Sequence, residues 1–106
     1  LYHFLRVAPA LIDRFVEQTL GPLIAYDDRR RGELIRTIEA YFEADGSVKL
    51  AGEKLFAHPH TVSYRLKQVE KLTGWSLRDA EDKLRMQLAL RARRLAQARR
   101  EADETA

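Results

Sequence analysis

The side chains best suited to chemistry are gathered in residues 58–71. Histidine, serine, threonine and tyrosine can hydrogen-bond to base edges or phosphates, and lysine and arginine neutralise phosphate charge. Val62, Leu66 and Val69 recur among them at i, i+4 and i+7, which is the spacing of one helix face. The pattern predicts a helix with an apolar inner side and an outer side that includes His60, Ser63, Tyr64 and Lys67.

A second short helix is predicted directly before this one. Ser47 is a suitable cap for its start, and Val48, Ala51 and Leu55 follow at helical spacing. The residue before a proline is pushed out of helical geometry, so Pro59 lies at or near the first position of the second helix. Two short helices joined by a tight turn over residues 47–73 predict a helix-turn-helix, whose second helix enters the DNA major groove.

Two further helices are predicted on the N-terminal side of this motif. The first begins near Pro9 and is expected to stop at Gly21-Pro22, and a polar connector occupies residues 27–32. The second ends at Asp45-Gly46, where Gly46 supplies a left-handed cap. Their apolar stripes are Leu11, Ile12, Phe15, Val16 and Thr19, and then Leu34, Ile35, Ile38, Tyr41 and Phe42.

The last helix is predicted to follow Gly74, with Asp79 or Asp82 as its cap and Trp75 and Leu77 as a hydrophobic plug before it. Residues 98–106 are expected to fray. The chain is therefore predicted to be a small all-α domain of about five helices containing a helix-turn-helix. Core residues expected in the last helix are Leu84, Met86, Leu88, Ala89, Leu90 and Leu95.

Composition restricts the classes of protein to which the chain could belong. Its 106 residues, 45% of them apolar, suit one small folded domain. It contains no cysteine, which excludes disulfides and thiolate chemistry and fits a reducing cytoplasm. No apolar run approaches the roughly 20 residues that cross a bilayer, so we expect no membrane partner.

Charge is distributed unevenly along the chain. Residues 1–46 carry 6 basic and 8 acidic side chains, whereas residues 47–100 carry 13 basic and 5 acidic ones. The basic excess coincides with the predicted DNA-reading motif, as a phosphate-binding surface requires. The arginines at the far end of the last helix could serve either as a DNA arm or as a solubilising helix end.

Several runs together resemble the C-terminal domain of PucR/CdaR-type regulators, which are bacterial transcription factors of purine catabolism, sugar-diacid use and related pathways. The resemblance spans about residues 11–96 and is carried by the pattern His-Pro-x-Thr-x-x-Tyr-Arg-Leu over residues 58–66, by Glu-Lys-Leu-Thr-Gly over 70–74, and by Leu-Gly-Pro-Leu-Ile-Ala-Tyr-Asp over 20–27. It implies a DNA-binding domain at 22–97 with sensory domains upstream. Residues 1–21 would then be a linker helix or the last helix of an upstream domain.

Alignment of Thr61-Val62 with the start of generic recognition helices assigns roles to single residues. Base-edge candidates are Pro59, His60 and Tyr64, and phosphate candidates are His58, Thr61, Ser63, Arg65, Lys67 and Lys71. Thr61 could instead be a local cap, Tyr64 could lean on the domain, and Arg65 could pair with Glu70 or another acid.

Two positions depart from the pattern of related motifs. Many of these regulators have Asn where this chain has His60, which bears on base preference because Asn can pair bidentately with adenine. Generic motifs often place glycine in the turn, where this chain has Phe56. We therefore predict that the turn is not a left-handed glycine turn.

Other functions find little support. His58 and His60 could hold zinc only with a third ligand, and the remaining histidine is His3, so neither a metal nor another cofactor is expected. No nucleophile elbow, phosphate loop or metal-protease helix is present, so the chain is not expected to be an enzyme.

The favoured function is sequence-specific binding of double-stranded DNA in the cytoplasm, associated with the nucleoid when bound. A homodimer would place its recognition helices about 34 Å apart. The alternative is a helical interaction or dimerisation module without useful DNA affinity, which would use the apolar faces of helices 9–20 and 82–96.

Overall fold

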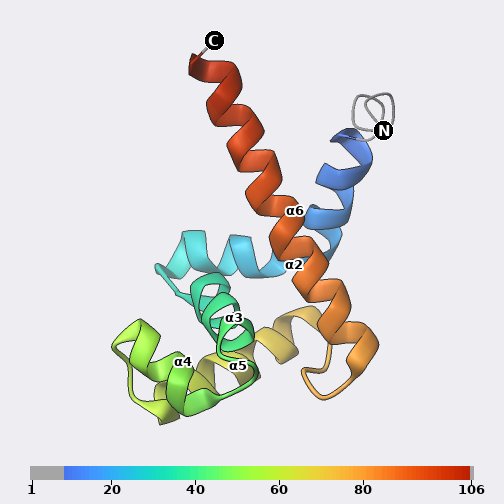
Figure 1. Ribbon diagram of the computed structural model, residues 1–106. Coiled ribbons are helices and arrows are strands. Elements are labelled where there is room, and N and C mark those ends of the chain that lie inside the picture. The colour runs from blue at the N-terminus through green and yellow to red at the C-terminus, as the bar shows by residue number, and fades with distance from the viewer. Residues whose placement is uncertain (1–8, 106) are drawn as a thin grey trace.

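A computed structural model describes residues 9–105, and this part of the chain folds into five helices without a strand. The helices are α2 (Pro9–Arg30), α3 (Leu34–Glu43), α4 (Val48–Leu55), α5 (Pro59–Thr73) and α6 (Ala80–Thr105) (Figure 1). The predicted all-α fold with about five helices is confirmed. None of these helices combines the length and apolarity needed to cross a bilayer.

One hydrophobic core joins all five helices. Leu23 of α2, Ile38 of α3, Ala51 of α4, Val62 of α5 and Met86 of α6 are all fully buried in it. The helices α3, α4 and α5 pack on one another, while α2 packs along α6 and also contacts α5. The long helices α2 and α6 therefore form a frame that supports the three shorter ones.

The predicted stop at Gly21-Pro22 is wrong, because α2 continues through both residues to Arg30. Proline inside a helix removes one backbone hydrogen bond and bends the helix. Figure 1 shows α2 changing direction part-way along its length. Leu20 and Leu23 are fully buried on either side of the pair. Their burial in the core carries the helix across a sequence that would end an isolated one.

The predicted caps Ser47, Gly74 and Asp79 are confirmed, whereas α3 ends shortly before Gly46. The Ser47 hydroxyl accepts a hydrogen bond of 3.1 Å from the Leu50 N–H and caps α4. Gly74 caps α5 in a left-handed conformation at φ 76°. The cap of α3 is Ala44, and Asp45 and Gly46 follow it in left-handed conformations at φ 52° and 83°. Asp79 accepts from the Asp82 N–H at 2.9 Å and is the cap of α6. These local signals are reliable because each satisfies backbone groups that a helix end leaves without partners.

The prediction that the leucines of the last helix all lie in the core is wrong. Leu84, Leu88 and Leu95 are 55%, 50% and 71% exposed, whereas Met86, Ala89 and Leu90 are buried. α6 has one side against the body, and the exposed leucines lie on another. The helix also continues through residues 98–105, which are exposed; their fraying remains a prediction.

Candidate nucleic-acid interface

The start of α5 is fixed by its two flanking residues. His58 has extended backbone angles, and its Nδ1 accepts a hydrogen bond of 3.0 Å from the His60 N–H. Pro59 occupies the first turn, as predicted. The imidazole of His58 therefore acts as the N-cap, and this excludes Thr61 as the cap of this helix. A capping role for His58 was not foreseen, since histidine is outside the usual set of capping residues.

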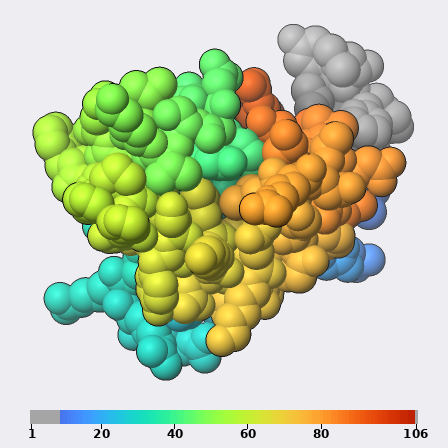
Figure 2. Space-filling view, turned by 90° about the horizontal axis from the view of Figure 1, so that it is seen from below, coloured from blue at the N-terminus to red at the C-terminus, as the bar shows by residue number. Residues whose placement is uncertain are grey.

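The side of α5 opposite its buried residues is exposed along its length. Val62, Leu66 and Val69 face the core, as predicted. The four exposed residues on the other side recur at i, i+4, i+7 and i+11, and they are His60, Tyr64, Lys67 and Lys71, which we call the α5 stripe. Figure 2 shows α5 (yellow) at the surface of the molecule, with α4 (green) along one of its edges.

The α5 stripe supplies hydrogen-bonding and cationic groups on one exposed helix face. Tyr64 is 61% exposed, so it does not lean into the domain, and its hydroxyl accepts a hydrogen bond of 2.9 Å from the Gln68 side chain. No acidic residue lies on the stripe itself, and Glu70 beside it accepts a hydrogen bond from the Leu77 N–H at 2.9 Å. An exposed helix face of this kind can enter a groove and bind polar edges and phosphates.

Arg65 points toward α3 rather than along the α5 stripe. Its Nη1 lies 3.3 Å from a carboxylate oxygen of Glu33 and 3.5 Å from the Thr37 hydroxyl, and its side chain is only 25% exposed. Arg65 therefore forms an ion pair, as considered above, but its partner is Glu33 and not Glu70. Its other considered role, contact with phosphate, stays a prediction. The contacts with Glu33 and Thr37 use the same nitrogen, so they do not engage the other donors of the guanidinium.

The turn between α4 and α5 contradicts the prediction made from Phe56. This residue caps α4 in a left-handed conformation, at φ 53° and ψ 42°, although it is not glycine. Its side chain is 96% exposed, so burial does not compensate for the strain. The Ala57 N–H donates to the Gly52 carbonyl at 2.9 Å, and this closes the turn. Hydrogen bonding and packing on both sides of the turn impose the conformation that glycine would adopt freely.

Two residues near the interface were missed by sequence reasoning. A Cβ on Gly52 would lie 2.6 Å from the carbonyl oxygen of Ala57, so only glycine permits the observed approach of α4 to the turn. Lys49 is exposed in the first turn of α4 and lines a shallow groove with Phe56 and Pro59. Its position two residues after the cap Ser47 was the signal that could have identified Lys49.

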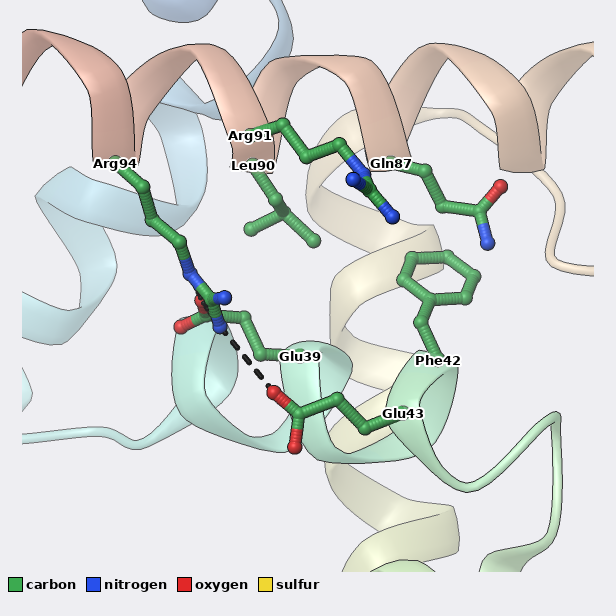
Figure 3. A pocket seen from close by; sticks show the side chains of 7 residues that line it. All are labelled: Glu39, Phe42, Glu43, Gln87, Leu90, Arg91 and Arg94. Carbon is green, nitrogen blue, oxygen red and sulfur yellow. Dashed lines mark hydrogen bonds and ion pairs between the residues drawn. The ribbon is translucent and has the colours of Figure 1, made fainter.

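A separate hollow lies between α3 and α6, away from the α5 stripe (Figure 3). Arg94 crosses it and binds Glu39 through Nε at 2.8 Å and Glu43 through Nη2 at 3.3 Å. These hydrogen bonds, chiefly the one that Arg94 donates to Glu39, raise the pKa of Arg94 above its ordinary value. The arginine therefore links α6 to α3 and places a paired charge at the edge of the hollow.

The histidine pair shows no metal-binding arrangement in the described residues. The rings of His58 and His60 stack with centroids 4.9 Å apart. Within residues 9–105 no three histidine, cysteine or acidic side chains are grouped as metal ligands would be. His3 lies outside the described residues. The stacked rings are instead arranged with one as the helix cap and the other at the start of the α5 stripe.

Comparison with known proteins relates the whole motif to transcriptional regulators. Residues 34–92 match the family model for the PucR C-terminal helix-turn-helix domain. The chain is 36% identical over 84 residues to the purine catabolism regulatory protein of Bacillus subtilis, covering 79% of this chain and 16% of that protein. It is 33% identical to the proline-responsive transcriptional activator PutR of the same organism, covering 72% of this chain and 18% of that protein.

A third similar protein is the DNA-binding transcriptional activator AdeR of Bacillus subtilis, at 29% identity over 73% of this chain and 18% of that protein. The chain thus spans less than a fifth of the length of these three curated relatives. No solved structure gives a significant match.

Proposed function

Because this chain belongs to the family of PucR C-terminal helix-turn-helix domains, we propose that it binds duplex DNA sequence-specifically, with α5 in the major groove. Domains of this family are regulatory DNA-binding domains and are generally not enzymes. The observation that carries the proposal is the α5 stripe, a single exposed helix face of polar, aromatic and basic residues. The major groove, about 12 Å wide, admits an α-helix of this kind.

The proposed base contacts lie at the beginning and middle of α5. Pro59 and His60 are exposed in its first turn, and Tyr64 follows on the same side one turn later. Contacts to base edges from such positions distinguish one site from another. His60 offers a single donor or acceptor at each ring nitrogen, so its preference should differ from the bidentate adenine contact of an Asn.

The proposed phosphate contacts surround these residues. Lys67 and Lys71 extend along the same exposed face, while Thr61 and Ser63 are half-buried at its edges. His58 contributes through the helix start that it caps, and Arg65 through donors not used by Glu33 and Thr37. Anions are favoured at a helix N-terminus, where backbone N–H groups and the helix dipole both point outward.

We further propose that the chain is the output domain of a longer cytoplasmic regulator that associates with the nucleoid when bound. It covers only a small share of each relative's length, and those relatives are named as regulators or activators. Effector recognition would then belong to upstream sensory domains. Residues 22–97 remain our proposed extent of the DNA-binding unit, and α2 connects it directly to the preceding residues.

A second candidate function is supported by the exposed leucines of α6. Leu84, Leu88 and Leu95 are each at least half exposed, and Leu11 of α2 is 63% exposed. Such residues suit contact with another protein or a second copy of the chain. In a homodimer this contact and DNA binding would act together, whereas an interaction module alone would have no DNA affinity.

The decisive experiment measures binding to labelled random duplex DNA at several salt concentrations, followed by selection of the preferred site. We expect affinity to fall steeply with salt and to fall less steeply in Lys67→Ala/Lys71→Ala, since each lost phosphate contact lowers the slope by about 0.9. The control is Arg99→Ala/Arg100→Ala, which removes the same charge from the exposed far end of α6, an end that extends away from α5 (Figure 1). Absence of binding at low salt would favour the interaction module.

A further inference from the structure

We propose that Arg29, Arg30 and Arg31 form a second phosphate-binding segment, outside the helix-turn-helix and beside the recognition helix. These three arginines, which we call the arginine segment, are all exposed where α2 ends and the connector to α3 begins. The inference rests on the proposed function, because it names a further surface that would contact the same DNA.

The arginine segment lies next to α5 in space. Glu33, two residues after Arg31, lies 3.3 Å from Arg65 of α5, and α2 itself contacts α5. Figure 2 shows this part of the chain (cyan) along one edge of α5, while α4 (green) lies along the other. A helix seated in the major groove has a phosphate backbone on each side. The arginine segment is therefore placed to meet the strand opposite the one that α4 would meet.

Local packing holds the arginine segment in one conformation. Asp27 accepts hydrogen bonds from the Leu34 and Ile35 N–H groups at 3.0 and 3.1 Å, which tie the end of α2 to the start of α3. A Cβ on Gly32 would lie 2.9 Å from both Asp27 and the Tyr26 ring, so the connector packs closely against α2. Arg31 itself is left-handed at φ 49°. A conformation of this kind persists where the surrounding structure imposes it.

Charges around the arginine segment leave it basic. The carboxylate of Asp27 is occupied by backbone donors of α3, and Glu33 binds Arg65 and also Arg36, the latter at 3.7 Å. Asp28, directly before the segment, is an exposed acid. Three exposed guanidinium groups beside one exposed carboxylate favour the binding of phosphate.

The arginines also have a role in α2 itself. Arg29 and Arg30 occupy its last turn, where cations balance the helix dipole, and the Arg30 guanidinium lies 5.7 Å from the centre of the Tyr26 ring. These interactions do not occupy all the guanidinium donors, and they orient Arg30 without burying it. A purely helix-ending role would give the arginine segment no effect on the salt dependence of DNA binding.

The test compares two triple variants of the 106-residue chain on the selected duplex. Arg29→Gln/Arg30→Gln/Arg31→Gln removes the charges of the segment. Arg91→Gln/Arg99→Gln/Arg100→Gln removes the same number from exposed positions of α6, a helix whose far half extends away from α5 (Figure 1). The measured quantity is the slope of log K against log salt. We expect the first variant to lose about 0.9 of slope for each phosphate contact removed, and the second to keep the slope of the unmodified chain.

A lysine variant and the unmodified chain separate loss of charge from loss of fold and from absence of DNA binding. Arg29→Lys/Arg30→Lys/Arg31→Lys should keep the original slope, and this separates loss of charge from loss of fold if the glutamine variant is less stable. If both glutamine variants and the unmodified chain have equal slopes, the phosphate-binding role of the arginine segment is overturned, while the proposed function of α5 stays intact. Failure of the unmodified chain to bind DNA at low salt would overturn both.

Discussion

Individual polar side chains of α5 differ in the contacts they already make within the domain. His60, Lys67 and Lys71 are exposed on the α5 stripe, whereas His58 caps the helix and Arg65 is bound to Glu33. The two lysines can contact DNA without first breaking an intramolecular contact, whereas the His60 ring stacks on that of His58. His58 and Arg65 support the helix itself, so substitution at those positions should change stability as well as binding.

His60→Ala should change the preference for one DNA site more than overall affinity. Loss of one base-edge hydrogen bond corresponds to about 1 kcal/mol, which lowers the ratio of specific to random binding roughly fivefold. Competition between the selected duplex and random duplex measures this ratio. Lys67→Ala is the matched control: it should weaken binding to both duplexes equally and leave the ratio unchanged, since a phosphate contact is lost on both. Equal losses on both duplexes for His60→Ala would contradict its assignment to base reading.

Arg65→Ala should destabilise the domain. The substitution removes the Glu33 ion pair and leaves the hydroxyl of fully buried Thr37 without this partner. We expect a loss of about 1 kcal/mol, because the pair is partly exposed and screened. In a domain of this size the loss lowers Tm by about 4–8 °C in thermal unfolding. Glu33→Gln should lower Tm by a smaller amount. If Arg65→Ala leaves Tm unchanged but lowers the salt dependence of DNA binding, Arg65 contacts phosphate and does not stabilise the domain.

The orientation of neighbouring helices relative to one another depends on a few residues between them. Gly52 lets α4 approach the turn before α5, and left-handed Phe56 closes that turn. Asp27 joins the end of α2 to the start of α3 through two hydrogen bonds. These contacts set the orientation of α5 relative to the elements on each side of it, and therefore the surface that could meet DNA.

Gly52→Ala should destabilise the domain, whereas Gly21→Ala should not. The new methyl group at position 52 meets a backbone carbonyl at 2.6 Å, and relief of that clash must shift the turn. The methyl group at position 21 meets the end of the Glu17 side chain at 2.9 Å, which can move aside. We expect a loss of about 1–2 kcal/mol for Gly52→Ala and a gain of up to about 1 kcal/mol for Gly21→Ala. Urea unfolding measures both, and similar midpoints would contradict the close approach at Gly52.

In the whole domain, the α5 stripe and the far half of α6 lie at different ends of the molecule. α5 lies with α3 and α4 at one end of the molecule, while the far half of α6 extends away from them (Figure 1). Leu95, in this far half, would therefore be available to a second copy if α5 contacts DNA as proposed. A symmetric dimer built in this way would be isologous, with the same surface contributed by each copy.

Leu88→Ala/Leu95→Ala should weaken binding of a second copy without destabilising the monomer. Both side chains are at least half exposed, so we expect each substitution to change unfolding free energy by less than about 0.5 kcal/mol. Cooperative binding to duplexes with two half-sites about 34 Å apart should decrease. The control Met86→Ala removes a fully buried side chain and should destabilise by about 2–5 kcal/mol. Unchanged cooperativity in the double variant would exclude these leucines from a dimer contact.

Sequence alone determined those features that depend on neighbouring residues. The cap at Ser47, the left-handed glycines at 46 and 74, and the buried side of α5 all follow from hydrogen bonding or periodicity within a few residues. The family resemblance came from the same local pattern and is confirmed by the match over residues 34–92. The assignment of single residues to bases or phosphates remains a prediction, because it depends on a partner molecule.

Only the tertiary structure decided the features that depend on distant parts of the chain. Burial of Leu20 and Leu23 carries α2 through Pro22. Packing between α4 and the turn imposes a left-handed conformation on Phe56, and the Glu33 contact turns Arg65 toward α3. The exposure of the α6 leucines depends on which side of the helix meets the body. In each case the free energy of packing across the fold outweighs a local preference of about 1–3 kcal/mol, which is all that sequence patterns report.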